Sequence, residues 1–228
     1  MTLSVREQLK ASGIFRAFPE DARKRLDQLC RIHTLDSDAV IYHRGDEPKA
    51  LHGVVDGAVK LIGESPAGKF FLYELVSPGQ WFGEQSAIDG ESRGQTAMTI
   101  GPVTIISLLR KDLMDLLNQQ PELYQHFVSV LCQRLRRAGK ALEETAFLPV
   151  GARMANTLLR MQRVRERHDI KLSQEEIAAS LGVTRQSIYR ILKEWQLQGW
   201  VQVGYGNVTL LQPEALQEWV SEFNARVR

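Results

Sequence analysis

The sequence predicts an α+β protein with a β-rich N-terminal part, one long helix and a C-terminal helix-turn-helix module. Three observations support this prediction: glycines interrupt short apolar runs over 38–107, an apolar repeat of 3.5 residues spans 128–145, and two short helical patterns meet at Gly182. The expected parts are 1–118 for the β-rich domain, 119–148 for the long helix and 149–228 for the helix-turn-helix domain.

The composition is that of an ordinary globular protein. The 228 residues are 43% hydrophobic and 25% charged, which excludes a disordered or fibrous chain. Neither a signal peptide nor a run of 18 apolar residues occurs, so we expect a cytoplasmic protein without a membrane partner. Cys30 and Cys132 form no C-x-x-C motif and no disulfide framework, and we expect no metal site.

The β-rich region begins after two predicted helices, near Val5–Leu9 and across Pro19–Cys30. Its apolar runs are rich in Val, Ile, Phe, Tyr and Thr, which favour strands. Glycines interrupt these runs about every eleven residues, at Gly45, Gly57, Gly68, Gly79, Gly90 and Gly101. This region of 38–107 therefore predicts an all-β small barrel or roll of six to eight strands.

The long helix carries an apolar stripe with alternating spacings of three and four residues. Its members are Val128, Leu131, Leu135, Ala138, Leu142 and Thr145. Such a stripe is typical of a helix that packs along a partner helix, which predicts a homodimer. The alternative is that the stripe packs on the chain's own β-domain. Pro149 and Gly151 predict a boundary, and Ala152–Val164 has the pattern of a further amphipathic helix.

The helix-turn-helix pattern lies between Leu172 and Trp200. Ser173 followed three residues later by Glu176 is a capping box, which begins a helix. Gly182 ends that helix, because glycine tolerates positive φ, and the hydroxyl of Thr184 can cap the next one. The buried side of the first helix is predicted to be Ile177, Ala178 and Leu181.

The second helix has two chemically different faces. At 100° per residue, one face collects Ile188, Ile191, Leu192 and Trp195, and the other collects Arg185, Gln186, Tyr189, Arg190 and Lys193. The apolar face packs against the protein. A folded protein has no internal reason to concentrate hydrogen-bond donors on the other face, which therefore points to an external ligand.

The polar face matches the chemistry of double-stranded DNA, whose major groove is about 12 Å wide and admits a helix. Arg185 and Arg190 can pair with guanine, and Gln186 can pair with adenine. Tyr189 can contact a phosphate or a thymine methyl group. Further candidate phosphate contacts are Ser173, Thr184 and Ser187, and Lys193 is a further candidate DNA-binding residue.

Two weaker features agree with a DNA-binding C-terminal domain. The stretch WVQVGYGNVTLL alternates around Gly204–Asn207, which predicts a β-hairpin and hence a wing. Residues 1–148 carry 18 basic and 19 acidic side chains, whereas 149–228 carry 11 basic and 8 acidic ones, so the net charges are −1 and +3. The basic surplus lies with the helix-turn-helix.

These residues together resemble the cyclic AMP receptor protein and fumarate-nitrate regulator superfamily of bacterial transcription factors. FGEQSAIDGESRGQT (82–96) resembles its phosphate-binding cassette, AFLPVGARMANTLL (146–159) the segment after its dimerisation helix, and 172–200 its DNA-binding signature. The resemblance implies a cyclic-nucleotide-binding-type β-roll, a dimerisation helix and a winged helix-turn-helix. It also implies homodimers on palindromic operators with half-sites roughly 34 Å apart, and we expect RNA polymerase as a further partner.

The resemblance assigns candidate effector residues, and this sequence departs from the pattern at some of them. Gly83, Glu84 and Arg93 match the groups that engage the ribose and the cyclic phosphate. Gly94 replaces the phosphate-binding Ser of the family, and Ala138 with Gly139 replaces its adenine-binding Thr-Ser pair. The lost hydrogen bonds predict cyclic AMP binding weakened tenfold to many hundredfold, at about 0.5 to 1.5 kcal/mol each. An ion pair between Glu84 and Arg93 that shapes an empty roll is the alternative.

The sequence is less informative about effectors other than a cyclic nucleotide. The iron–sulfur branch of the family has several N-terminal cysteines, and none precedes Cys30, so no such cluster is expected. Haem remains an alternative to a cyclic nucleotide as the effector, because the sequence offers several candidate axial ligands and does not single out one of them. They are His33, His43, His52, His126, His168, Cys30 and Cys132.

Two other classes of function compete with a DNA-binding regulator. A cupin-like metal enzyme would need a clustered H-x-H pair, and His43 and His52 are isolated. No catalytic motif appears, so we predict that the protein is not an enzyme. A ligand-binding module that controls a protein partner, with a vestigial helix-turn-helix, would tolerate other residues at Arg185 and Arg190.

Overall fold

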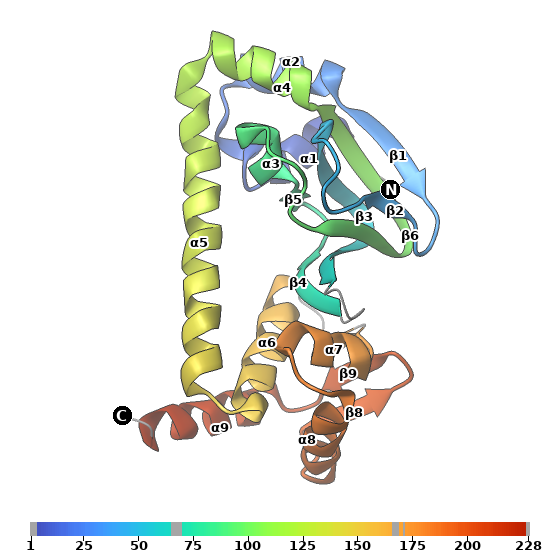
Figure 1. Ribbon diagram of the computed structural model, residues 1–228, viewed down its shortest axis with the longest axis vertical. Helices are drawn as coiled ribbons and strands as arrows, with labels where there is room; N and C mark the ends of the chain where they lie inside the picture. The colour runs from blue at the N-terminus through green and yellow to red at the C-terminus, as the bar shows by residue number, and fades with distance from the viewer. Residues whose placement is uncertain (1–3, 65–69, 166–168, 171, 227–228) are drawn as a thin grey trace. The chain divides into compact units, whose positions relative to one another are not determined.

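The computed structural model describes residues 4–64, 70–165, 169–170 and 172–226. Contacts divide the chain into two units. The first is built from residues 1–63 and 73–137, and the second mainly from residues 138–228. Figure 1 shows the helices and strands of both units.

The N-terminal unit combines four helices with an antiparallel sheet. The helices are α1 (Val5–Ala11), α2 (Glu20–Leu29), α3 (Glu84–Asp89) and α4 (Arg110–Gln119). The strands are β1 (Arg31–Leu35), β2 (Val40–Tyr42), β3 (Ala50–Glu64), β4 (Phe70–Val76), β5 (Trp81–Phe82) and β6 (Thr96–Leu109). Single 3₁₀ turns lie at Phe15–Ala17 and Pro121–Leu123. The two helices that the sequence predicts ahead of the β-rich region are confirmed.

The sheet has the strand order β1-β6-β3-β4, while β2 also pairs with β6 and β5 pairs with β3. The predicted count of six to eight short strands within 38–107 is wrong in detail. The structure describes five strands there, and β1 precedes them. Strands β3 and β6 run for 15 and 14 residues through Gly57 and Gly101, which adopt φ of +83° and +68°. Glycine permits these bends without ending the strand. Gly68 lies outside the described residues.

Helix α3 is a second difference, because the sequence predicts only strands in this region. Gly83 and Gly90 flank the helix, and both have a φ of +80°. The two glycines therefore turn the chain into and out of one short helical segment between β5 and β6.

The core of the N-terminal unit joins the helices to the roll. Phe15 lies at its centre and contacts Trp81 edge-on, with ring centroids 4.7 Å apart, and Phe18 at 5.2 Å. Phe127 at the start of the long helix completes this aromatic group. Helix α4 contributes the buried side chains Leu113, Leu116 and Leu117. This packing fixes the first turns of the long helix on the roll.

The long helix, α5 (Tyr124–Phe147), carries the predicted apolar stripe. In the single chain Val128, Leu135 and Leu142 are 55%, 73% and 72% exposed. Ala138 and Thr145 are also exposed, and Leu131 is half-buried. The stripe is thus largely uncovered, which is an unfavourable state for leucines on a helix unless a partner covers them.

The C-terminal unit contains the predicted helix-turn-helix and hairpin. Its elements are α6 (Val150–Arg165), β7 (Asp169–Ile170), α7 (Gln174–Leu181), α8 (Arg185–Leu197), β8 (Val201–Gly204), β9 (Asn207–Leu210) and α9 (Pro213–Arg226). The three strands form a small antiparallel sheet in the order β7-β9-β8. The predicted helix after Pro149 is confirmed as α6, where Met154 and Leu158 are buried and the side chain of Val164 is not described.

Candidate nucleic-acid interface and effector site

Capping residues determine where the two helices of the helix-turn-helix begin and end. The Ser173 hydroxyl accepts a hydrogen bond from the backbone N–H of Glu176 at 3.2 Å, and the Glu176 carboxylate accepts one from the Ser173 N–H at 2.9 Å. The predicted capping box of α7 is therefore confirmed. Gly182 ends α7 with φ +65°, and the Thr184 hydroxyl accepts from the Ser187 N–H at 3.2 Å to begin α8.

The end of α7 has a contact that the sequence analysis does not predict. Arg153 of α6 donates from Nη1 to the carbonyl oxygen of Leu181 at 3.2 Å. The last carbonyls of a helix lack intrahelical partners, and a guanidinium satisfies one of them here. Arg153 belongs to the segment that resembles the family, but its spacing alone gives no sign of this role. This hydrogen bond holds the C-terminal end of α7, where the turn to α8 begins, against α6.

Helix α8 buries one face and exposes the other. Ile188, Leu192 and Trp195 are at most 2% exposed, and Trp195 packs edge-on against Trp219 of α9 at 5.9 Å. Ile191 is half-buried. The residues predicted to face outward are all exposed, namely Arg185, Gln186, Tyr189, Arg190 and Lys193. The division into two faces, read from the helical period, agrees with the structure.

The three hydroxyl groups that are candidates for phosphate contact already form hydrogen bonds within the protein. Ser173 is half-buried within its capping box, and its Oγ lies 2.9 Å from Glu176 Oε2. Thr184 and Ser187 hold each other with their hydroxyl oxygens 2.9 Å apart. These three groups first stabilise the starts of α7 and α8, and any contact with a phosphate would add to that role.

The hairpin β8–β9 ends in a two-residue turn that presents a fully exposed tyrosine. Gly206 has φ +70°, and Tyr205 beside it protrudes with no part of its side chain covered. The sequence predicts a wing at this turn, but no contact was expected from Tyr205. An exposed aromatic ring at a hairpin tip is the signal that could have singled it out.

The cassette of the N-terminal unit contains the first candidate effector group, Arg93, which is only 3% exposed. Its Nη1 donates to the carbonyl of Gly83 at 3.0 Å and to the Ser86 hydroxyl at 2.9 Å, and its Nη2 donates to the carbonyl of Ala50. The guanidinium also lies 4.2 Å from the ring centroid of Tyr42. Burial lowers the pKa of Arg93. Arg93 therefore links the cassette to β3 through these hydrogen bonds.

The Arg93 guanidinium has room in this position because residue 83 is a glycine. A Cβ atom at this position would lie 2.5 Å from Arg93 Nη1, and the backbone adopts φ +80°. Both observations require glycine. Gly94, in contrast, is exposed, and a Cβ there would meet nothing within 4 Å.

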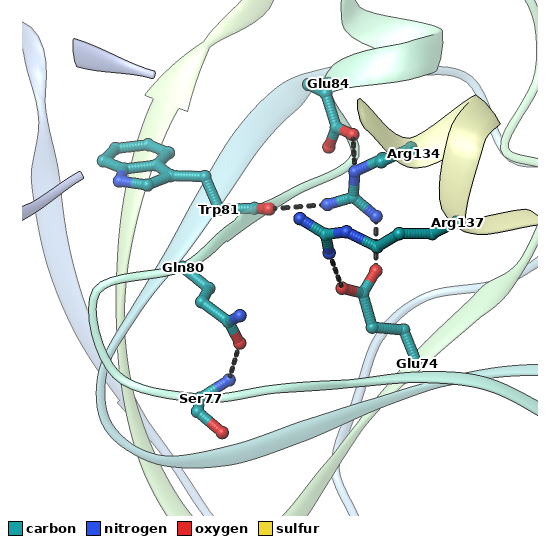
Figure 2. Close-up of polar contacts among 7 residues, drawn as sticks. All are labelled: Glu74, Ser77, Gln80, Trp81, Glu84, Arg134 and Arg137. Atoms are coloured by element: carbon teal, nitrogen blue, oxygen red, sulfur yellow. Dashed lines mark hydrogen bonds and ion pairs between the residues drawn. The ribbon is translucent and has the colours of Figure 1, made fainter. Parts of the chain in front are cut away.

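Glu84, the second candidate effector group, is 2% exposed and binds Arg134 of α5 (Figure 2). Arg134 Nε lies 2.5 Å from Glu84 Oε1. The alternative prediction of a Glu84–Arg93 ion pair is wrong, since Glu84 forms its ion pair with Arg134. Burial raises the pKa of Glu84, and the positive charge of Arg134 opposes that rise.

Arg134 has two further partners, both on the roll. Its Nη1 forms an ion pair with Glu74 of β4, and its Nη2 donates to the carbonyl of Trp81 at 3.0 Å. Arg137 approaches the other oxygen of Glu74 at 3.7 Å. We refer to Glu74, Glu84 and Arg134 as the ion-pair cluster. No sequence pattern pointed to this role of Arg134.

A cavity of about 440 Å³ lies beside Arg93. Its lining residues include Tyr42, Lys49 and His52. His52 stacks against Phe82 at 5.5 Å, and its Nδ1 lies 2.9 Å from the Ser107 hydroxyl. Burial lowers the pKa of His52 to about 3, so its imidazole is neutral near pH 7.

The remaining candidates do not gather at this site as a ligand set. Ala138 and Gly139 are exposed on α5 and offer no side-chain donor. Among the candidate haem ligands, Cys30 is buried in the core, Cys132 and His33 are exposed, and His168 lies outside the described residues. Within the described ranges, no group of three or more His, Cys, Asp or Glu side chains could hold a metal ion.

Two protein families match this chain in the order that the fold predicts. The Cyclic nucleotide-binding domain family matches residues 32–120, and the Crp-like helix-turn-helix domain family matches residues 152–219. This chain belongs to the CRP/FNR family of transcriptional regulators. It is thus a DNA-binding regulator with a cyclic-nucleotide-binding-type domain, as the sequence predicts.

Relatives of this CRP/FNR regulator include a CRP-like cAMP-activated global transcriptional regulator from Mycobacterium tuberculosis. It is 28% identical over 219 residues, which cover 92% of this chain and 97% of that protein. The Cyclic AMP receptor protein of Thermus thermophilus is 29% identical and covers 78% of this chain and 82% of its own length.

Solved structures agree with the fold. A CRP/FNR-family regulator from Thermus thermophilus has a TM-score of 0.70 at 26% identity, covering 84% of this chain and 98% of its own. FixK2 from Bradyrhizobium japonicum has a TM-score of 0.74 at 22% identity, with 83% and 96% covered, and supports the fold alone. Every helix in the described part of this CRP/FNR regulator is too short or too polar to cross a membrane.

Proposed function

We propose that the protein acts as a homodimer that reads a palindromic DNA operator with the exposed face of α8. The observation that carries this proposal is the solvent-facing set of Arg185, Gln186 and Arg190 on a helix whose other face is buried. Arg side chains pair with guanine and Gln with adenine in the major groove. Lys193 and Tyr189 supply phosphate contacts or apolar contact, and Tyr205 is a further contact from the wing.

The uncovered stripe of α5 supports the dimer. Leu135 and Leu142 are each more than 70% exposed, and a second copy of the same helix would cover both by a seam of the coiled-coil type. Two α8 helices in one dimer would occupy half-sites one helical turn apart, at roughly 34 Å. A dimer therefore explains the stripe and predicts a palindromic operator.

Further properties follow from this role as proposals. We infer that RNA polymerase is a partner, that the protein works in the cytoplasm where bacterial DNA lies, and that it catalyses no reaction. The effector, if one regulates DNA binding, is not identified by the relatives, because the cAMP in their names is a property of those proteins. We retain 1–118, 119–148 and 149–228 as the proposed functional parts.

Selection from a pool of random-sequence DNA duplexes tests the proposal. The full-length protein should enrich a two-fold symmetric sequence, and the complex should contain two chains by light scattering. The double variant Arg185→Ala/Arg190→Ala should dimerise equally well and enrich nothing. Enrichment of no sequence by the folded wild-type dimer would instead favour a module that acts on a protein partner.

A further inference from the structure

A buried carboxylate connects the end of the long helix to the helix-turn-helix domain. Glu144 of α5 is 9% exposed, although its neighbours Glu143 and Thr145 are exposed. Its Oε1 accepts a hydrogen bond from Asn156 Nδ2 at 3.3 Å, and its Oε2 forms an ion pair with Arg160 Nη1 at 3.5 Å. Asn156 and Arg160 are four residues apart on α6 and therefore lie on the same face of that helix. Because a buried carboxylate requires such partners, these contacts hold α6 against α5.

Helix α6 is in turn fixed to both helices of the helix-turn-helix. Arg153 donates from Nη1 to the carbonyl of Leu181 at the end of α7. Gly151 at the start of α6 lies against Trp219 of α9, where an added Cβ atom would come within 3.0 Å of the indole ring. Trp219 packs edge-on against Trp195 of α8. A change in the position of α6 would therefore be passed on to α7 and α8.

The connection between α5 and α6 is short. Helix α5 ends at Phe147 and α6 begins at Val150, so Leu148 and Pro149 join them. Rotation about the backbone dihedrals of these residues would swing α6 relative to α5. The contacts of Glu144 bridge this connection and restrain that rotation.

Glu144 faces away from the apolar stripe of α5. It follows Leu142, which is 72% exposed, by two residues, and two residues correspond to about 200° around a helix. Helix α6 and a second copy of α5 would therefore lie on different sides of the same helix. Glu144 is thus placed to relate the helix-turn-helix domain to the dimer without taking part in the seam.

We propose that Glu144 is a positioning residue for DNA recognition, because its contacts with Asn156 and Arg160 set the angle between α5 and α6. In a dimer this angle determines the separation of the two α8 helices. The inference rests on the proposed function. One additional base pair moves the half-sites apart by about 3.4 Å and rotates them by about 34°, so a dimer with a fixed angle accepts one spacing. Base preference within each half-site remains a property of α8.

Operators with altered spacing test this role of Glu144. The operator that the full-length protein enriches is also made with one base pair added at its centre and with one removed. The wild-type protein should bind the original spacing about tenfold or more tightly than either altered operator, since a mismatch requires the DNA to deform. Glu144→Gln removes the charge and keeps the shape of the side chain, so it should reduce this preference to about threefold or less. The variant should still sediment as a dimer and keep the base preference of each half-site.

Glu143→Gln is the matched control, because it makes the same change at an exposed position one residue away and should keep the wild-type spacing preference. Circular dichroism verifies that each variant folds. If Glu144→Gln does not fold, Arg160→Met replaces it, because the Arg160 side chain is 54% exposed and its loss breaks the same ion pair. A folded variant with the wild-type spacing preference would overturn the inference. Equal binding of all three spacings by the wild-type protein would also overturn it.

A distance measurement without DNA separates this inference from the proposed function. Spin labels are attached to Lys140→Cys on α5 and Ser221→Cys on α9, both at exposed positions, in a Cys132→Ser background. An excess of unlabelled protein ensures that the two labels belong to one chain. The distribution of distances should be broader with Glu144→Gln, or with its replacement, than without it, and equal widths would contradict the inference. If the wild-type protein enriches no operator, the proposed function fails and this measurement still decides the inference.

Discussion

The hydroxyl of Thr184 accepts a hydrogen bond from the backbone N–H of Ser187 at 3.2 Å, and this contact begins α8, the helix that we propose to bind DNA. The cap satisfies one of the N–H groups that a helix leaves unpaired. The residues between the cap and its donor, Arg185 and Gln186, are consequently held in the first turn and exposed. Predictions about DNA binding depend on this geometry.

Replacing Arg190 with alanine should weaken binding to the operator by about 1 to 3 kcal/mol, which is roughly 5- to 150-fold, and relax the base preference at one position of each half-site. A guanidinium that pairs with guanine carries base information, which alanine cannot. Gel shift with every single-base variant of the operator measures both effects. Arg44→Ala, which removes an equal charge from an exposed position on the roll, is the control. An unchanged base preference would show that Arg190 does not contact a base.

Lys193 should behave differently from Arg190, because its ammonium group is suited to a phosphate. Lys193→Ala should weaken binding by a similar factor on all sequences. It should also reduce the magnitude of the slope of log affinity against log salt concentration by about 0.9 for each lost phosphate contact. Fluorescence anisotropy at several salt concentrations measures this slope. A base-specific loss with an unaltered slope would place Lys193 at a base edge.

The stripe of α5 predicts the oligomeric state. Leu135→Asp would bring two carboxylates together at an apolar seam, so the variant should sediment as a monomer and lose operator binding. Gln133→Asp introduces the same charge at an exposed position of the same helix and should sediment as a dimer. Analytical ultracentrifugation compares the two. A dimeric Leu135→Asp protein would place the interface elsewhere.

The turn between α7 and α8 predicts a backbone effect. Gly182 adopts φ +65°, and an alanine in the left-handed region costs about 1 to 2 kcal/mol, so Gly182→Ala should reduce the free energy of unfolding by that amount. Urea denaturation measures it. Gly94→Ala is the matched control, since a Cβ atom there meets nothing within 4 Å and no positive φ opposes it. Equal stability of the two variants would contradict the argument.

His52 predicts a pH dependence of stability. Its pKa is about 3 in the folded protein, against 6.5 for an ordinary histidine. Between these values the unfolded chain binds a proton that the folded protein does not. The His52 contribution to the free energy of unfolding is therefore complete above pH 6.5 and decreases as the pH falls towards 3.

The variant His52→Phe keeps an aromatic ring against Phe82 and should remove about one proton from this dependence. Denaturation at a series of pH values measures the slope, and His43→Asn, at an exposed histidine, should leave it unchanged. A wild-type slope in His52→Phe would show that His52 titrates normally.

Periodicity predicts much of this protein because local rules decide it. The capping box at Ser173, the turn at Gly182 and the polar face of α8 each follow from interactions within a few residues. The strand count is the instructive error. Gly57 and Gly101 have the same sequence appearance as glycines that end strands. Nevertheless β3 and β6 continue past them, because the two strands pair on both sides of a register shift at these glycines.

The sequence by itself determined the α+β order, the apolar stripe of α5 and the exposed polar face of α8, since helical and strand periods depend on neighbours along the chain. Only the tertiary structure decided the partners of the charged groups. Glu84 and Arg134 are 50 residues apart in the chain, and their pairing depends on how α5 packs on the roll. Arg93 likewise finds Ala50 and Tyr42 only in the folded unit. Buried charges must be compensated by whichever group the fold brings near, and no local pattern encodes that choice.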